Sequence, residues 1–291
     1  MRALRLPFTS ASILPFVSGS LINRSSFSLL TFSLGLVSAV ATHLGANLIN
    51  DYADSRSGVD WQDKKFYKFF GGSKLIQDKV LAEIFYLQSA IFCFLLAGGC
   101  VVLLAYILKD LSIISYFLAI ALLGVSYSHQ PLQLAYHRLG ELVIFTLFGP
   151  ALVMGGYFIQ TKIFPDLVSF LLSLPFGFLT TAILFANEVP DYSEDKSCRK
   201  MNWVSIIGKE KAYLLYFILI SGALLSIALN ILNSNLSAWS ALSFILILPA
   251  LKATGILKND YNDKIKLMES SKLTIAIQVL AGLAVILGII T

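Results

Sequence analysis

The feature that most constrains the fold of this chain is a series of apolar runs long enough to cross a lipid bilayer as helices, which takes about 20 residues each. Read against the polar breaks, these runs predict about nine membrane helices. The expected spans are residues 8–22, 27–52, 79–106, 111–128, 139–160, 167–188, 211–232, 237–256 and 272–290. The runs are too long for strands and lack period-two alternation. We therefore predict an all-α, polytopic membrane bundle that forms a single domain over residues 1–291.

The low content of charged residues supports this interpretation. Of the 291 residues, 57% are hydrophobic and 13% are charged, whereas soluble domains carry roughly 25% charged residues. This composition excludes a disordered chain, a coiled coil, a disulfide-stapled secreted domain and an ordinary cytosolic enzyme. The 3 cysteines match no metal-ligand spacing and imply no disulfide.

The distribution of basic residues predicts the orientation of the chain. Of the 22 Lys and Arg residues, all but Arg24, Lys109 and Lys162 fall in the N-terminus or in every second connection, Lys64 of the first long loop among them. Positively charged connections stay in the cytoplasm. The N-terminus and the two long polar loops are thus predicted to be cytoplasmic, with the C-terminus outside an inner (plasma) membrane. The net charge of +5 then reflects orientation and contact with anionic lipids. It needs no nucleic-acid partner, and no feature of the sequence specifies an oligomeric state.

Two connections, residues 53–78 and 189–209, are longer and more polar than the rest, and acidic residues open each of them. At the first, Asn47, Asp51 and Asp54 are related as i, i+4 and i+7, which places them on one helix face. The spacing predicts a cluster of oxygen ligands where this helix leaves the membrane.

The second connection repeats the pattern. Asn187, Asp191 and Asp195 are related as i, i+4 and i+8, which is again one face if the helix continues through Pro190. The alternative is that Pro190 begins a new turn. Both stretches therefore contain Asn-x-x-x-Asp at the end of an apolar span.

Carboxylates grouped at a membrane surface repel one another unless a cation joins them. Mg²⁺ prefers oxygen ligands, and it typically takes one or two carboxylates together with substrate phosphates. Two such clusters, with Lys74 and Lys200 in the same loops, suit a Mg²⁺-bridged diphosphate whose remaining oxygens are contacted by lysine. The alternative is a solvated loop in which Asp and Lys only pair with each other.

These stretches resemble the UbiA superfamily of intramembrane aromatic prenyltransferases. Asn50-Asp51-Tyr-Ala-Asp54 is similar to the start of its first motif, and Asp191-Tyr-Ser-Glu-Asp195 to the whole of its second. The spacing Asp54-x-x-x-Gly58-x-Asp60 resembles the menaquinone (MenA-like) branch, which prenylates 1,4-dihydroxy-2-naphthoate. Four further stretches resemble that branch: residues 71–74, 127–132, 140–142 and 148–150.

The resemblance implies a UbiA-like central chamber capped by cytoplasmic loops and a role for each polar position. Two Mg²⁺ ions on the diphosphate of a polyprenyl donor would be held by Asp51, Asp54, Asp191 and Asp195. Support as ligands or hydrogen-bond donors would come from Asn47, Asn50 and Asn187. Further contacts with the diphosphate would come from Lys74 and Lys200.

The resemblance also implies that an aromatic acceptor attacks the allylic carbocation, and that a naphthoate acceptor then loses CO₂. Asp60 is a candidate for deprotonating the acceptor hydroxyl, with a metal ligand or a loop salt bridge as the alternative. Tyr127 is a candidate for contacting the substrate, and an interfacial tyrosine is the alternative. His43 falls one turn before Asn47 on the same face; a packing histidine is the favoured interpretation, and a residue that lines the chamber is the alternative. Glu141, an ionisable residue within an apolar helix, is left outside the predicted site.

Three alternatives to this function stay open. A UbiA-type enzyme with another acceptor would use 4-hydroxybenzoate, homogentisate, a lipid glycerol phosphate or haem. An intramembrane terpene cyclase would use the same metal motifs. A secondary transporter also places Asp and Asn within membranes, but such sites lie near the bilayer midplane on broken helices, whereas here the acids lie at the predicted cytoplasmic ends.

Overall fold

The computed structural model describes residues 2–63 and 65–291, so Lys64 of the first polar loop lies outside the described residues. Within these residues, seven helices are long and apolar enough to cross a membrane, and two further apolar helices, Leu6–Leu21 and Ser112–Ser126, are shorter. The predicted all-α membrane bundle is confirmed, and about nine is a fair approximation of its helix count.

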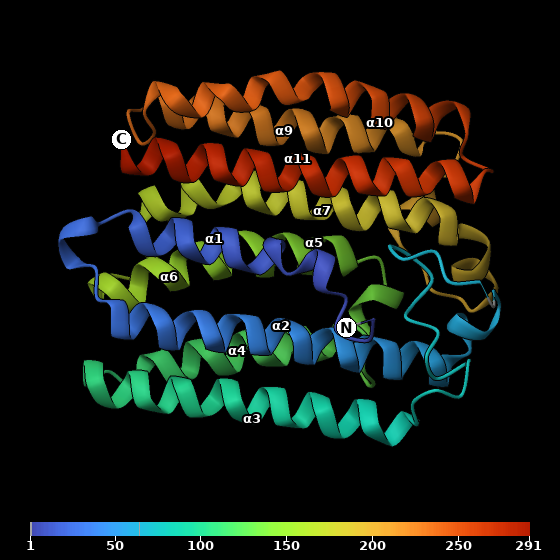
Figure 1. Cartoon of the computed structure of the whole chain (residues 1–291), viewed down its shortest axis with the longest axis horizontal. Helices are drawn as coiled ribbons and strands as arrows, with labels where there is room; N and C mark the ends of the chain where they lie inside the picture. Colours follow the sequence, from blue (N-terminus) through green and yellow to red (C-terminus); the bar gives the residue numbers. More distant parts are fainter. Residues whose placement is uncertain (1, 64) are drawn as a thin grey trace.

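The helices lie side by side, and the chain passes back and forth along the bundle (Figure 1). Their bounds are α1 Ser10–Leu21, α2 Leu29–Ser57, α3 Glu83–Leu108, α4 Ser112–Ser126, α5 Gly140–Thr146, α6 Leu152–Thr161, α7 Leu167–Ser197, α8 Trp203–Ile207, α9 Ala212–Leu232, α10 Ile247–Asn259 and α11 Lys264–Ile290. The C-terminus lies at one end of the bundle, and the connections after α2 and α7 lie at the other (Figure 1). Both polar connections therefore reach the same end, as the alternating charge pattern predicts.

Two of the expected membrane helices are not regular throughout. Between α5 and α6 the chain forms a π-helical turn, Leu147–Ala151, which contains Pro150. A proline has no N–H to donate and its ring displaces the carbonyl one turn earlier, so a wider turn accommodates it. The expected eighth helix begins as a 3₁₀ segment, Ala238–Leu246, and continues as α10.

The two polar loops begin later than predicted, because the acidic stretches are themselves helical. α2 continues to Ser57, where Gly58 ends it with a φ of 89°, a left-handed conformation that glycine adopts without penalty. α7 continues through Pro190 to Ser197. Asn187 and the two aspartates that follow it therefore share one helix face.

Glycine allows a close approach between α1 and α6. A Cβ atom on Gly19 of α1 would lie 1.9 Å from the carbonyl oxygen of Val153 in α6. The close approach is reciprocal. A Cβ atom on Gly156 of α6 would lie 2.6 Å from the carbonyl oxygen of Phe16 in α1. The α1–α6 pair thus depends on side-chain-free surfaces on both helices.

We expect Gly19→Ala to destabilise the protein by about 1–3 kcal/mol, the usual range for overpacking a buried contact. Gly99→Ala in α3 is the matched control, since none of the described atoms lies within 4 Å of a Cβ there. The midpoint of thermal unfolding in detergent measures both variants. Equal midpoints would show that α1 and α6 separate at little cost.

Candidate active site

A cavity of about 300 Å³ lies among helices α1 to α7 and is lined by loop residues at one end. The wall from α2 runs along a single face of that helix, from Gly35 to Asp54. Along most of this length the cavity is lined by apolar side chains, and polar side chains gather towards the loops. The predicted central chamber, capped by loops, is therefore present.

Asp54 and Asp51 from the first acidic stretch are both buried, and each is paired with a cation. Asp54 accepts a hydrogen bond from the Tyr136 hydroxyl at 2.7 Å, and its second oxygen lies 3.2 Å from the Lys200 ammonium. Asp51 pairs with the Arg5 guanidinium, which lines the chamber. Asp54 thus lines the chamber itself, and Asp51 pairs with a residue that does, Arg5.

Asp191 and Asp195 of the second stretch line the same chamber. Asp191 accepts a hydrogen bond from the backbone N–H of Gly71 at 2.9 Å. Asp195 accepts one from the Asn202 amide at 2.8 Å and lies 3.8 Å from the Lys200 ammonium. The structure brings together the two motifs, which are far apart in the sequence.

Lys200 is the cation that joins the two motifs. Burial acts to lower the pKa of its ammonium, but the neighbouring Asp195 and Asp54 carboxylates raise it well above its ordinary value. The Tyr136 ring also lies under this ammonium, 5.5 Å from it. Lys200 therefore places a positive charge at the polar end of the chamber.

The loop between α2 and α3 adds a second buried lysine. Lys74, 2% exposed, donates to the Asp60 carbonyl at 2.6 Å and lies 3.5 Å from its carboxylate. Burial raises the pKa of Asp60 to about 7, and the Asp54 and Asp51 charges act in the same direction against Lys74 and Arg5. Asp60 can therefore exchange a proton near neutral pH, which a candidate general base requires.

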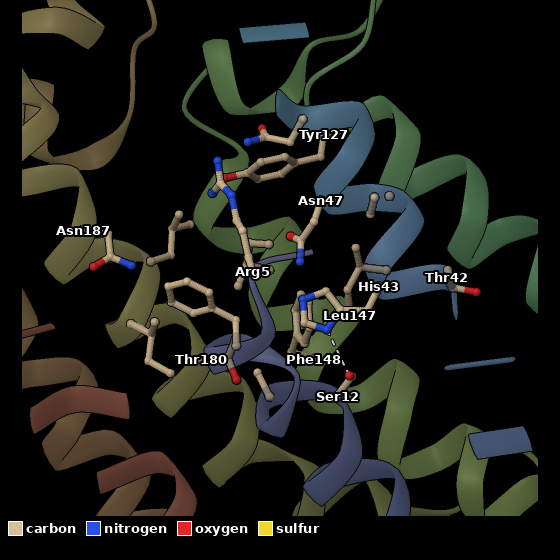
Figure 2. Close-up of a pocket in the computed structure, with 18 of the residues that line it drawn as sticks. Arg5, Ser12, Thr42, His43, Asn47, Tyr127, Leu147, Phe148, Thr180 and Asn187 are labelled. Carbon is tan, nitrogen blue, oxygen red and sulfur yellow. Dashed lines mark hydrogen bonds between the residues drawn. The ribbon is translucent and has the colours of Figure 1, made fainter. Parts of the chain in front are cut away.

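The three predicted asparagines face the chamber with unused hydrogen-bonding capacity. In the part of the chain that the structure describes, buried atoms without a hydrogen-bond partner include Asn47 Nδ2, Asn50 Oδ1, Asn187 Oδ1 and Asp51 Oδ2. A buried polar atom left unpaired costs about 1–3 kcal/mol. Tyr127, at the end of α4, lines the same space; Figure 2 shows it beside Asn47 and Arg5.

These residues fit Mg²⁺ by the chemistry of their donors. Carboxylate and amide oxygens are the ligands that Mg²⁺ prefers, and several of them lie buried beside one chamber without partners. Among the described residues, however, no three His, Cys, Asp or Glu side chains already form a metal-binding group. Arg5, Lys74 and Lys200 instead pair with the acidic side chains, so a divalent ion would take over oxygens that these cations now contact.

Sequence reasoning missed several polar residues around the site. Arg5 was counted only as a charge that orients the chain, and Tyr136 carries no motif. Glu141 is fully buried, and one of its oxygens accepts a hydrogen bond from the Trp203 backbone N–H. It thereby holds the segment that carries Lys200. The signal for Glu141 was present, because an ionisable residue within an apolar span is usually functional.

The fold and the site define an integral membrane protein whose largely apolar chamber has charged and polar side chains at its loop end. The model of the UbiA prenyltransferase family matches residues 12–275. The chain belongs to this family. The family resemblance read from the motifs is confirmed at this level, and membership favours an enzyme over a secondary transporter.

Relatives of known sequence include eukaryotic proteins called UbiA prenyltransferase domain-containing protein 1. The chain is 29% identical to the human protein over 224 residues, which is 74% of this chain and 62% of that protein. It is 27% identical to the Dictyostelium discoideum protein over 197 residues, 65% of this chain and 57% of that one. The matched region thus spans about three-fifths of the length of these relatives.

Solved structures share the fold. A UbiA homolog from Aeropyrum pernix K1 superposes with a TM-score of 0.74 at 15% identity, covering 98% of both chains. A UbiA homolog from Archaeoglobus fulgidus bound to DMAPP and Mg²⁺ superposes with a TM-score of 0.67 at 18% identity, again covering 98% of both chains.

We expect Gly72→Ala to lower prenyl transfer by about tenfold to a hundredfold, because small displacements of site groups have effects of this order. Gly72 has a φ of 74°, and a Cβ atom there would lie 2.3 Å from the Asp60 carboxylate. Gly71→Ala is the matched control: its φ is 71°, but the nearest atom, on Asp191, is 3.6 Å away. The two variants share the backbone strain, so equal rates of product formation would show that the position of Asp60 is unimportant.

Proposed function

We propose that this chain transfers a polyprenyl group from polyprenyl diphosphate to 1,4-dihydroxy-2-naphthoate, with loss of CO₂, as a step of menaquinone biosynthesis. The observation that carries the proposal is the pair of acidic helix ends joined by Lys200 at the polar end of an apolar chamber. The spacing from Asp54 to Asp60 supports the naphthoate acceptor. The whole chain, residues 1–291, acts as one domain.

In this proposal, Mg²⁺ and diphosphate bind where the two motifs meet. The metal-binding oxygens belong to Asp51, Asp54, Asp191 and Asp195, with support from Asn47, Asn50 and Asn187. Bound Mg²⁺ supplies positive charge that stabilises the leaving diphosphate. The Archaeoglobus fulgidus homolog bound to DMAPP and Mg²⁺ supports a donor of this chemical class.

Two lysine side chains would stabilise the same negative charge on the diphosphate. Negative charge grows on the diphosphate as the allylic C–O bond breaks, and positive groups already fixed in place stabilise it without reorganisation. Lys74 is buried and Lys200 is half-buried, and both are held by their neighbours. They are therefore placed to bind the remaining diphosphate oxygens.

The acceptor completes the reaction inside the chamber. The ring carbon that carries the carboxylate bonds to the allylic carbon, and the carboxylate leaves as CO₂. Asp60 takes up the proton of a ring hydroxyl as the new C–C bond forms and returns it to that oxygen as CO₂ leaves, which gives the naphthoquinol. Tyr127 packs against the substrate. The apolar wall keeps water from the allylic cation, and the isoprenoid chain contacts that wall.

The distribution of Lys and Arg supports a plasma-membrane orientation with the N-terminus and the site loops in the cytoplasm and the C-terminus outside. Anionic lipid head groups would then contact the basic end of the bundle. The soluble diphosphate donor head and the naphthoate would reach the chamber from the cytoplasmic side.

The acceptor is tested by mass spectrometry of products from the purified protein with Mg²⁺, geranylgeranyl diphosphate and 1,4-dihydroxy-2-naphthoate. We expect a prenylated naphthoquinol that lacks the carboxyl group, and its loss in excess EDTA. A parallel sample with 4-hydroxybenzoate is expected to give no prenylated product. Diphosphate release without the naphthoquinol would move the enzyme to another acceptor or to cyclisation.

Asp51→Asn and Asp191→Asn should each reduce product formation by at least about a hundredfold, because a neutral amide binds Mg²⁺ far more weakly than a carboxylate. Asp166→Asn is the control, since that carboxylate caps the start of α7 at the opposite end of the bundle. Membrane insertion and thermal unfolding are compared alongside the rate. Full turnover by the Asp51→Asn, Asp191→Asn double variant would contradict the two-motif site.

A further inference from the structure

A group of polar side chains lies inside the chamber away from the acidic residues. His43 is on the same face of α2 as Asp51 and eight residues before it, which is about 12 Å along the helix axis. His43, Asn47 and Thr180 all line the cavity, and Figure 2 shows them among apolar neighbours such as Leu147 and Phe148. The proposed mechanism uses neither His43 nor Thr180.

The hydrogen bonds of Ser12 determine which nitrogen of His43 carries the proton. The Ser12 hydroxyl donates its single proton to the Thr9 carbonyl at 3.0 Å. With the Ser12 proton on the Thr9 carbonyl, the 2.9 Å contact between Ser12 and Nδ1 of His43 is assigned as donated by the histidine. In a neutral imidazole with the proton on Nδ1, Nε2 is a hydrogen-bond acceptor. This second nitrogen points into the chamber, in the direction of Asn47 (Figure 2).

The hydroxyl of Thr180 is unusual for a threonine in a helix. Such hydroxyls commonly bond to a carbonyl one turn earlier, as Thr42 does to Ser38 at 2.8 Å and Thr181 does to Gly177 at 2.8 Å. Within residues 2–63 and 65–291, the Thr180 hydroxyl has no hydrogen-bond partner, although the residue is only 6% exposed. Its donor and acceptor capacity is therefore available to a molecule in the chamber.

An isoprenoid chain cannot satisfy these groups, since it carries no hydrogen-bonding atom. A ring hydroxyl could donate to Nε2 of His43, and a second oxygen on the ring could accept from Thr180 or from the Asn47 amide. Asn47 lies one turn from Asp51, so a ring held here would lie next to the diphosphate end of the chamber. An oxygen-substituted aromatic ring fits this polar patch better than the donor tail does.

We propose that His43 and Thr180 form a subsite that binds the oxygen substituents of the aromatic acceptor, with Nε2 of His43 accepting a hydrogen bond from a ring hydroxyl. The inference rests on the proposed function, because it requires an aromatic acceptor. It assigns acceptor specificity to residues outside the two acidic motifs. Ser12 is a positioning residue, since it acts by orienting the imidazole.

Equilibrium binding without donor separates this subsite from catalysis. Two ligands that differ by one hydroxyl, 1-hydroxy-2-naphthoate and 2-naphthoate, are titrated into the protein in lipid nanodiscs, and naphthoate fluorescence reports binding. We expect the wild-type protein to bind the hydroxylated ligand about tenfold more tightly, as one well-placed buried hydrogen bond provides. His43→Phe should remove this preference.

Two further variants test the geometry where the phenylalanine variant fails to fold. Ser12→Ala removes the group that fixes the imidazole, so the preference for the hydroxylated ligand should fall while the ring remains. Thr180→Val should weaken binding of 1-hydroxy-2-naphthoate about threefold to tenfold. Thr42→Val is the matched control: Thr42 lines the same chamber, but its hydroxyl already donates to the Ser38 carbonyl at 2.8 Å, so binding should be unchanged.

The outcomes separate the two levels of the proposal. If the wild-type protein prefers the hydroxylated ligand and folded His43→Phe and Ser12→Ala variants keep the same preference, the subsite is wrong while the proposed function stands. If the wild-type protein binds neither naphthoate but still releases diphosphate from the donor, the proposed acceptor is wrong and the subsite falls with it.

Discussion

The site depends on a lysine held between two carboxylates that come from different helices. Lys200 lies 3.2 Å from Asp54 and 3.8 Å from Asp195, at the ends of α2 and α7. In a poorly hydrated interior, removal of one partner of such a group leaves an uncompensated charge, at a cost of about 3–5 kcal/mol. Lys200 thus stabilises the close approach of the acidic ends of α2 and α7.

The backbone around Lys200 explains why it stays in place. Arg138 donates its backbone N–H to the Met201 carbonyl at 2.8 Å, and Lys200 donates its own to the Asp195 carbonyl at 2.8 Å. Glu141 accepts from the Trp203 N–H from the buried start of α5. The segment after α7 is therefore tied to two other elements. If a metal ion bound Asp54 and Asp195, the Lys200 ammonium would lose both carboxylates as partners. These backbone hydrogen bonds would then keep Lys200 at the site.

Much of the fold could be predicted from the sequence, because the bilayer imposes its length on every apolar run. The helical spacing of Asn47, Asp51 and Asp54 was also readable, since it is a local property of one helix. Partners distant in sequence were not readable. Arg5 and Asp51 meet across 46 positions, and only the packing of α1 against α2 brings them together. The true ends of α2 at Ser57 and of α7 at Ser197 were missed because the polar connections were taken to begin where the apolar runs end.

On the proposed function, the distribution of polar side chains along the chamber indicates where each substrate would bind. Cations and unpaired oxygens gather at the loop end, where a diphosphate can satisfy them. One or two turns further in, His43 lines the chamber among apolar neighbours, and the Thr180 hydroxyl has no hydrogen-bond partner among the described residues. Beyond them the wall at Gly35, Ile113 and Ile159 is apolar. One of the proposed substrates has a charged head and a hydrocarbon tail, and the other is a flat ring with oxygen substituents. If the two exchanged positions, each would leave buried polar groups unpaired.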